Sequence, residues 1–527
     1  MLDRLKGYKR RLTGQTVSSI ISPEHILINI NRSKFLMSTD IPKGDFMGHP
    51  KALWMLFSSE FWERFSFYGM RAILGPYVAL TFFEHLGDKA DAEASLTYGG
   101  YTSMVYMTGI LGGYVADKVL GYQRSIMLGG ALMAVGLFVL LSPTMSGFLF
   151  GLALIVVGNG LFKPNISTMV GKLYTPEDPR RDSGFTIFYM GINAGALLAP
   201  LVCGVWLGAL YGFKWGFLAA GIGMLFGIFV FHLSSHLLGN VGKPIEGKNQ
   251  KKSLVQVIIA AFVLTVPVYI LLSKSEILGY ILSIMMLGLC AYFVYSGVKS
   301  GSKVQLQRYI AMLILFVANM AFWALFEQAG SSLNFFARDF ITLPDWMNFT
   351  VFQSANPVFI ILLAPIFAWM WPKLESWKMN PSIPRKFAFG LLGAGLGFYV
   401  LVFAIQNMLS EGGTVPWEML ALCYLIHTMG ELCLSPIGLS MVTKLAKPEE
   451  TGLAMGGWFL SIATALFIAG RIAAIAAGGG GGEHASAAGS IEGYMTVFEQ
   501  LFYGGLIFAA FFFLVAPFIN KLMHGVK

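Results

Sequence analysis

The stretch that decides the fold is LFSSEFWERFSFYGMRAILGPYVA at 56–79, an apolar segment interrupted by charged residues. Roughly 20 residues are enough to cross about 30 Å of hydrocarbon as a helix. Its polar side chains are Glu60, Glu63, Arg64, Tyr68 and Arg71, and their helical spacing places all five on one face. An ionised group near the bilayer centre costs about 2.5–3.5 kcal/mol, so we expect this stripe to face a cavity and find partners there. The alternative is a set of salt bridges that only cements helix packing.

The composition of the whole chain indicates the same class. Hydrophobic residues make up 56% of the 527 residues and charged residues only 12%, whereas soluble domains carry about 25% charge. We therefore expect an all-α integral membrane protein with fourteen transmembrane helices. The predicted spans are 50–83, 94–116, 122–141, 146–171, 183–208, 214–235, 254–273, 276–298, 308–337, 346–372, 386–408, 415–445, 450–475 and 494–523.

The distribution of basic residues predicts the orientation. Most of the 37 Lys and Arg fall in the N-terminal tail, the C-terminus and the even-numbered connectors, while the odd connectors hold only Lys89, Lys214, Lys274 and Arg338. Because basic loops stay in the cytoplasm, we expect a multi-pass protein of the cell (inner) membrane with both termini cytoplasmic. The net charge of +9 then reflects topology, and no nucleic-acid partner is implied.

Two of the predicted spans, 254–273 and 276–298, differ from the others in being almost free of ionisable residues. They follow a polar linker, and removing them leaves six plus six spans with every other loop on the same side. Two six-helix repeats are typical of the major facilitator superfamily. We predict a tail at 1–48, a first bundle at 49–238, a linker and inserted hairpin at 239–303, and a second bundle at 304–527. The tail is expected to be an interfacial amphipathic segment, a disordered basic tail or sequence upstream of a start at Met37, and we favour the last two.

Further charges lie inside the predicted spans. They are Lys163 in the fourth span, Glu327 in the ninth and Glu431 in the twelfth. Without the hairpin, these spans and the first one are helices 1, 4, 7 and 10, which occupy equivalent positions in the two repeats. The intramembrane charges therefore gather on helices related by the pseudo-symmetry.

These charges belong to five runs that carry a family resemblance. The runs are Glu60-Phe-Trp-Glu63-Arg64-Phe-Ser-Phe67-Tyr68-Gly69, Gly112-Gly-Tyr-Val-Ala-Asp117-Lys118, Gly158-Asn-Gly-Leu-Phe-Lys163-Pro-Asn165, Phe188-Tyr-Met-Gly-Ile-Asn193 and Gly430-Glu431-Leu-Cys-Leu-Ser435-Pro436. In these runs the chain resembles the proton-coupled oligopeptide transporter family, bacterial type. The resemblance covers essentially everything from Lys51 onward.

The resemblance implies roles for single residues. Proton coupling and gating are expected of Glu60, Glu63, Arg64, Arg71, Lys163, Glu327 and Glu431. The peptide carboxylate is expected near Arg64 and Lys163, and the peptide amino group at Glu431, with which Lys163 is expected to pair. Backbone ligands and pocket walls are expected at Tyr68, Tyr106, Asn193, Asn356, Trp323, Trp458 and Phe459.

The chemistry of the substrate agrees with these roles. A di- or tripeptide is a zwitterion with variable side chains, so its constant ends call for a cation and an acid. Asn amides and Tyr hydroxyls can then satisfy the peptide backbone, which is costly to desolvate. Protonation of a carboxylate removes its salt bridge and frees the base. The expected partners are the peptide, protons and the lipid bilayer. We expect no cofactor, no metal, and a functional monomer.

Other functions find less support in the sequence. An intramembrane enzyme would need a nucleophile–base or metal motif, and no HExxH, GxSxG or Walker A pattern is present. The remaining alternative is a major facilitator transporter of another small solute, such as nitrate or an amino-acid derivative. The acids in 56–79 favour the peptide. Phe67 and Gln328 depart from the family pattern. His427 lies four residues before Glu431 and could assist a proton relay, but a lone intramembrane His is more often a packing or hydrogen-bonding residue.

Overall fold

The computed structural model describes residues 44–175, 178–243, 250–478 and 490–526, and most of them are helical. The first part contains β1 (Asp45–Phe46), β2 (His49–Pro50), α3 (Lys51–Phe82), η1 (Glu84–Lys89), α4 (Ala90–Met107), α5 (Gly109–Val115), η2 (Ala116–Leu120), α6 (Tyr122–Val139), α7 (Met145–Lys172), α8 (Arg181–Pro200), η3 (Leu201–Gly208), α9 (Ala209–Tyr211), α10 (Phe213–Ser234) and η4 (Ser235–Leu238). Then come α11 (Gln250–Ser273) and α12 (Ser275–Lys299).

The last part of the chain is equally helical. It contains α13 (Lys303–Phe326), η5 (Glu327–Gly330), α14 (Ser332–Asp339), β3 (Ile341–Thr342), η6 (Phe349–Ser354), α15 (Ala355–Ser376), α16 (Ile383–Asn407), β4 (Val415–Pro416), α17 (Trp417–Leu445), η7 (Pro448–Glu450), α18 (Thr451–Ala476) and α19 (Ile491–Leu522). The strands form two short pairs, β1 antiparallel to β2 and β3 parallel to β4. Helices prevail because a backbone in hydrocarbon must satisfy its own hydrogen bonds.

Twelve helices in the described residues are long and apolar enough to cross a membrane. The two other predicted spans, 50–83 and 94–116, coincide with α3 and with α4 plus α5. These helices fall outside the twelve because α3 carries buried charges and α4 is rich in small polar residues. The multi-pass helical architecture is confirmed, and the count of fourteen spans stays a prediction. Of the predicted tail 1–48, residues 1–43 lie outside the described residues.

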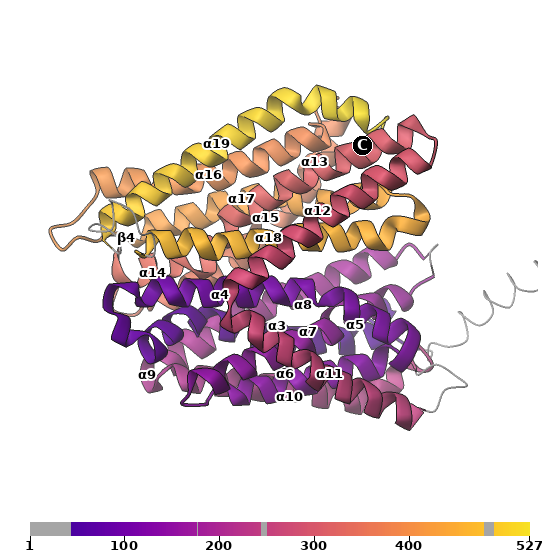
Figure 1. Ribbon diagram of the computed structural model, residues 1–527, viewed down its shortest axis with the longest axis horizontal. Coiled ribbons are helices and arrows are strands. Elements are labelled where there is room, and N and C mark those ends of the chain that lie inside the picture. Colours follow the sequence, from indigo (N-terminus) through magenta and orange to yellow (C-terminus); the bar gives the residue numbers. More distant parts are fainter. Residues whose placement is uncertain (1–43, 176–177, 244–249, 479–489, 527) are drawn as a thin grey trace, which may run out of the picture.

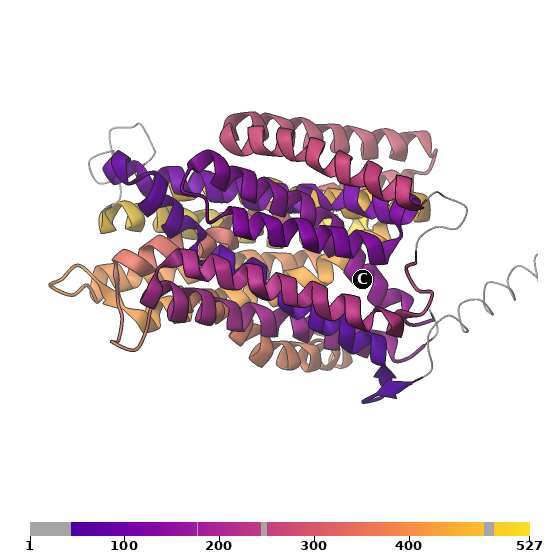
Figure 2. The same cartoon turned by 90° about the horizontal axis from the view of Figure 1, so that it is seen from below.

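The helices form two groups that lie side by side. Figure 1 shows the indigo and purple helices up to α10 in the lower half and the orange and yellow helices from α13 onward in the upper half. We call these groups the first and second halves. β1 and β2 lie at the same end of the molecule as the C-terminus (Figure 2). A chain that crosses the membrane an even number of times begins and ends on the same side, which agrees with this placement of β1, β2 and the C-terminus.

Helices α11 and α12 lie along one side of the assembly (Figure 2). The first packs against α7 and α4, and the second packs against α13 and α18. The pair therefore touches both halves from the outside. No element of the pair supplies an intramembrane charge, as the sequence indicated.

The predicted span 308–337 is not one continuous helix. α13 ends at Phe326, the 3₁₀ turn η5 follows, and α14 begins after Ser331, whose φ and ψ of −127° and −98° are not helical. Glu327 is the first residue of this interruption. The break places a carboxylate at an interruption of a segment long enough to span a membrane, and hydropathy alone does not reveal it.

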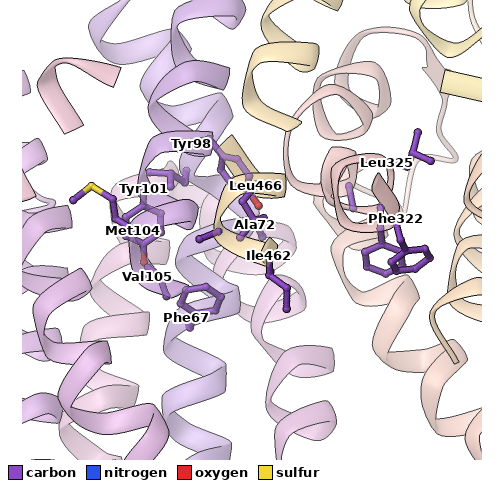
Figure 3. Close-up of a cluster of buried hydrophobic side chains, with 14 of the residues drawn as sticks. Phe67, Ala72, Tyr98, Tyr101, Met104, Val105, Phe322, Leu325, Ile462 and Leu466 are labelled. Atoms are coloured by element: carbon purple, nitrogen blue, oxygen red, sulfur yellow. The ribbon is translucent and has the colours of Figure 1, made fainter. Parts of the chain in front are cut away.

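The two halves touch most closely where α4 meets α18. A Cβ added to Gly99 would lie 2.7 Å from Cα of Gly470, so only glycine permits this approach. Buried side chains surround the junction, as Figure 3 shows for Phe67 and Ala72 of α3, Tyr98, Tyr101, Met104 and Val105 of α4, and Ile462 and Leu466 of α18. This apolar packing borders the polar residues described next.

Candidate functional site

The first polar cluster is formed by α3 itself. Arg64 lies between two carboxylates: its Nε is 3.2 Å from Glu60 Oε1, and its Nη2 donates to Glu63 Oε1 at 2.7 Å, with a second short contact from Nε to Glu63. All three side chains are at most 3% exposed. The stripe predicted from helical spacing is therefore buried and internally paired.

A residue of another helix completes this cluster. Asn159 of α7 donates from Nδ2 to Glu63 Oε1 at 3.1 Å. Glu60 Oε2 is buried and has no hydrogen-bond partner among the described residues. Two carboxylates share one guanidinium, so the cluster has an excess negative charge and a free acceptor oxygen. This combination suits a group that takes up a proton or a cationic ligand.

The second cluster joins the two halves. Arg71 of α3 donates from Nη2 to Glu327 Oε2 at 2.5 Å, and from Nε to Tyr98 Oη at 2.5 Å. The ion pair is only 11% and 6% exposed at its two side chains. The ring of Tyr68 lies 5.6 Å from the guanidinium carbon. A single arginine thus connects α3, α4 and the break after α13.

Lys163 and Glu431 do not form the expected pair. Lys163 Nζ lies 4.5 Å from the ring centre of Tyr106, and no carboxylate among the described residues is within ion-pair distance of it. Glu431 accepts instead from Asn356 Nδ2 at 2.8 Å, and Asn356 also donates to Thr428 Oγ1 at 3.0 Å. Because the two side chains belong to different halves, their distance depends on how the halves are oriented.

The aromatic residues predicted as pocket walls have different surroundings. Trp458 is 2% exposed and packs edge-on against the rings of Phe316 and Phe387, so in this structure its side chain lies in the core, and its role as a pocket wall stays a prediction. Phe459 is 37% exposed and lies 6.5 Å from the ring of Tyr106. The sequence of one apolar helix does not show which of its side chains, such as Trp458, become buried when the helices pack.

Asn193 and Trp323 were predicted to bind the substrate, and their polar atoms differ in whether they have a partner. Asn193 is buried and donates to the carbonyl of Tyr189 in its own helix at 3.0 Å. Trp323 has a buried Nε1 that finds no hydrogen-bond acceptor among the described residues. An indole donor without an acceptor inside a protein is a place where a ligand carbonyl gains a hydrogen bond.

The histidine considered for a relay lies apart from both clusters. His427 is 1% exposed, its Nε2 is 2.9 Å from the carbonyl oxygen of Ala394, and its ring packs against Phe398. It belongs to the same helix as Glu431 but contacts no acid in the described residues. A packing and hydrogen-bonding role accounts for this residue.

Polar contacts hold the halves together at one end, which we call the outer end, where α3 ends at Phe82 and α4 begins at Ala90. Besides Arg71–Glu327, Arg338 Nη2 is 2.7 Å from Asp91 Oδ2, and Asn334 donates to the carbonyl of Ala72 at 3.0 Å. Ser354 donates to the carbonyl of Leu197 at 2.8 Å. The outer end is closed in this structure.

Sequence reasoning missed two members of these clusters. Asn159 stands four residues before Lys163 on the same helix, and this spacing could have placed it on the same face. Tyr98 had no such signal, because its partner Arg71 lies on a different helix. The other site residues of α3, α7 and α17 are polar or charged and lie inside membrane-length helices, as predicted.

The comparisons with known proteins agree with this architecture. A family model described as the POT family matches residues 123–481. The uncharacterized transporter YclF of Bacillus subtilis (strain 168) is 38% identical over 504 residues, which cover 92% of this chain and 97% of YclF. The peptide transporter YePEPT of Yersinia enterocolitica subsp. palearctica serotype O:3 (strain YE-P4) is 39% identical over 463 residues, covering 82% of this chain and 90% of that protein.

A solved structure extends the similarity to three dimensions. The peptide transporter POT, crystallised as a glutamate-to-glutamine mutant in complex with alafosfalin, matches with a TM-score of 0.78 and 38% identity, covering 93% of this chain and 99% of that one. The predicted family resemblance and fold class are thereby confirmed. This chain belongs to the POT family, has the major facilitator superfamily fold, and is a multi-pass membrane transporter and no enzyme.

Proposed function

We propose that this protein is a proton-coupled symporter that imports di- and tripeptides by alternating access, works as a monomer in the cell (inner) membrane with both termini cytoplasmic, and uses no cofactor besides protons. The observation that carries the proposal is the pair of buried polar clusters on α3. One has an unpaired carboxylate oxygen, and the other is an ion pair between the halves. The peptide transporters among its relatives support the substrate class.

The proton would act on the ion pair between the halves. When Glu327 is protonated, its attraction to Arg71 loses the charge–charge component, and the outer end loses the more buried of its two ion pairs between the halves. The outer end then opens more readily. A proton shifts a conformational equilibrium only if it binds the two states with different affinities. A carboxylate that is paired in one state alone meets this condition and is therefore a suitable coupling group.

The peptide would bind between the clusters and Glu431. Arg64 and Lys163 offer positive charge to the peptide carboxylate, and Glu431, held by Asn356, offers negative charge to the amino group. Trp323 Nε1 and Asn193 can bond the peptide backbone. The separation of Lys163 from Glu431 agrees with two binding groups that await opposite ends of one zwitterion.

Uptake of labelled dialanine into proteoliposomes tests the proposal. The purified protein is assayed with and without an inward proton gradient, and unlabelled tripeptide or nitrate is added as a competitor. We expect gradient-driven accumulation that tripeptide, and not nitrate, suppresses. Accumulation without any gradient dependence would refute proton coupling, and competition by nitrate alone would replace the peptide by an inorganic anion.

Single substitutions test the roles proposed for individual residues. Lys163→Ala and Glu431→Gln should abolish driven uptake, whereas Glu63→Gln should keep peptide exchange and lose the dependence on the proton gradient. Matched controls are Lys172→Ala, an exposed lysine of the same helix as Lys163, and Glu276→Gln, an exposed acid of α12. Wild-type uptake by either of the first two variants would contradict the assigned roles.

A further inference from the structure

A cavity lies away from the transport site, within the second half. Its volume is about 650 Å³, and it is bounded by the end of α15, the start of α16 and the end of α19. α19 ends beside the C mark in Figure 1, at the end of the molecule opposite the closed outer end. The polar residues used below are Asn380, Ser382 and Lys386, and all three line the cavity.

Lys386 is the unusual member of this lining. Its side chain is only 8% exposed, and its Nζ lies 4.3 Å from the ring centre of Trp371, which also lines the cavity. No carboxylate of the described residues is within ion-pair distance of it. Glu375 also lines the cavity, but it forms no ion pair with Lys386 and instead accepts from Asn380. A buried ammonium without a directly paired anion is costly, and a cation–π contact compensates only part of that cost.

Two buried polar atoms beside Lys386 also have no partner in the described residues. Ser382 precedes α16 and makes no side-chain capping bond, and its Oγ is buried and unpaired. Asn380 donates to Glu375 Oε2 at 3.0 Å, but its own Oδ1 is unpaired. A hydroxyl donor, an amide acceptor and a cation therefore converge on one cavity.

The start of α16 adds a favourable field for an anion. This helix has 25 residues, and the N-terminus of a helix carries a partial positive charge with unbonded N–H groups. Residues 371–386 also include Lys373, Lys378 and Arg385 besides Lys386, against Glu375 as the acid. Trp377 is 57% exposed, as is typical of aromatic residues at a membrane interface.

We propose that this cavity binds a phosphate-bearing anion, held by the Lys386 ammonium, the Ser382 hydroxyl and the start of α16. A phosphate oxygen accepts from Lys386 and Ser382, and a hydroxyl of the ligand donates to Asn380. Two sources share this chemistry, the headgroup of an anionic phospholipid and free phosphate. Basic pockets between helices at the cytoplasmic boundary are known to favour such headgroups. The inference is independent of what the protein transports.

Binding measurements on the purified full-length protein test the site. Native mass spectrometry follows titration with phosphatidylglycerol, with phosphatidylcholine as the zwitterionic comparison, and calorimetry follows titration with inorganic phosphate in lipid-free detergent. Lys386→Met should weaken saturable binding at least tenfold, and Ser382→Ala about fivefold. Lys386→Arg should stay within about threefold of wild type. The matched control is Lys373→Met, an exposed lysine at the end of α15 that does not line the cavity.

The two titrations distinguish the sources. Saturable phosphatidylglycerol binding that depends on Lys386 identifies a lipid headgroup, and phosphate binding that depends on Lys386 identifies a soluble ligand. Either result supports the site. Equal loss in Lys386→Met and Lys373→Met, or no saturable binding of either ligand by the wild type, would overturn the proposal. If Lys386→Met does not fold, unchanged binding by Ser382→Ala would overturn it instead.

Discussion

The Arg64 and Arg71 clusters each pair an arginine of α3 with glutamate, yet they depend on different parts of the structure. Arg64 finds Glu60 and Glu63 within its own helix, one turn away or adjacent. Arg71 finds Glu327 across 256 positions of sequence, in the other half. The ion pairs of the first cluster need only that α3 is helical. The second exists only while the outer end is closed, so it can report and control the orientation of the halves.

The largest expected effect comes from removing the base of the local cluster. Arg64→Ala leaves the buried carboxylates of Glu60 and Glu63 without the guanidinium that pairs with both, and breaking a buried pair costs about 3–5 kcal/mol. We expect a clear fall in the thermal unfolding temperature in detergent, larger than for Arg71→Ala. Arg64→Lys, which keeps the charge, is the control. Equal unfolding temperatures for Arg64→Ala and wild type would show that the cluster is not a structural unit.

The next effect separates stability from conformation. Glu327→Gln removes the charge of the pair between the halves and keeps the side-chain shape, so we expect the outer end to open. Spin labels at Leu80→Cys and Ile475→Cys, two exposed positions near the ends of α3 and α18, should show a longer distance than in the wild-type background. Glu60→Gln should leave that distance unchanged. An identical response to both variants would remove the distinction between the clusters.

A larger side chain at the contact between α4 and α18 tests the same opening of the outer end while every charge stays in place. Gly99→Ala brings a Cβ to 2.7 Å from the backbone of Gly470, so the halves must separate locally. The same pair of labels should report a longer distance, by less than in Glu327→Gln because the ion pair stays intact. Gly288→Ala, where a Cβ meets nothing within 4 Å, is the matched control. A distance unchanged from wild type would mean that α4 and α18 slide without opening.

The smallest effect is expected at an exposed ion pair inside the first half. Arg180 contacts Asp178 and Asp45 at 2.9 Å, and its hydrogen bond holds the pKa of the Asp178 carboxyl below its usual value. This stabilisation is present above the unfolded pKa and disappears as pH falls through the lower folded value. Arg180→Ala should cost under about 1 kcal/mol in thermal unfolding at neutral pH, and less in acid. A larger loss would indicate that β1 and β2 are more important than their exposure suggests.

How far sequence reasoning reached differs between the two clusters. The face shared by Glu60, Glu63 and Arg64 was predictable because helical spacing is a local property. The partners Tyr98 and Asn159 were not assigned, since they depend on which helices become neighbours. The predicted Lys163–Glu431 pair failed for the same reason, because its two members belong to different halves. The burial of Trp458 was not predictable because apolar helices have similar sequences whichever of their side chains packing buries.

The amino-acid sequence by itself determined the class of this protein, the approximate limits of its membrane helices and the polar stripe of α3. These follow from hydropathy, charge bias and a period of about 3.6 residues, all of which act over short stretches. Only the tertiary structure decided that Arg71 reaches Glu327, that a helix breaks at this acid, and that Lys386 is buried beside a cavity. Such features arise from contacts between distant segments, whose free energy depends on geometry that no local pattern contains.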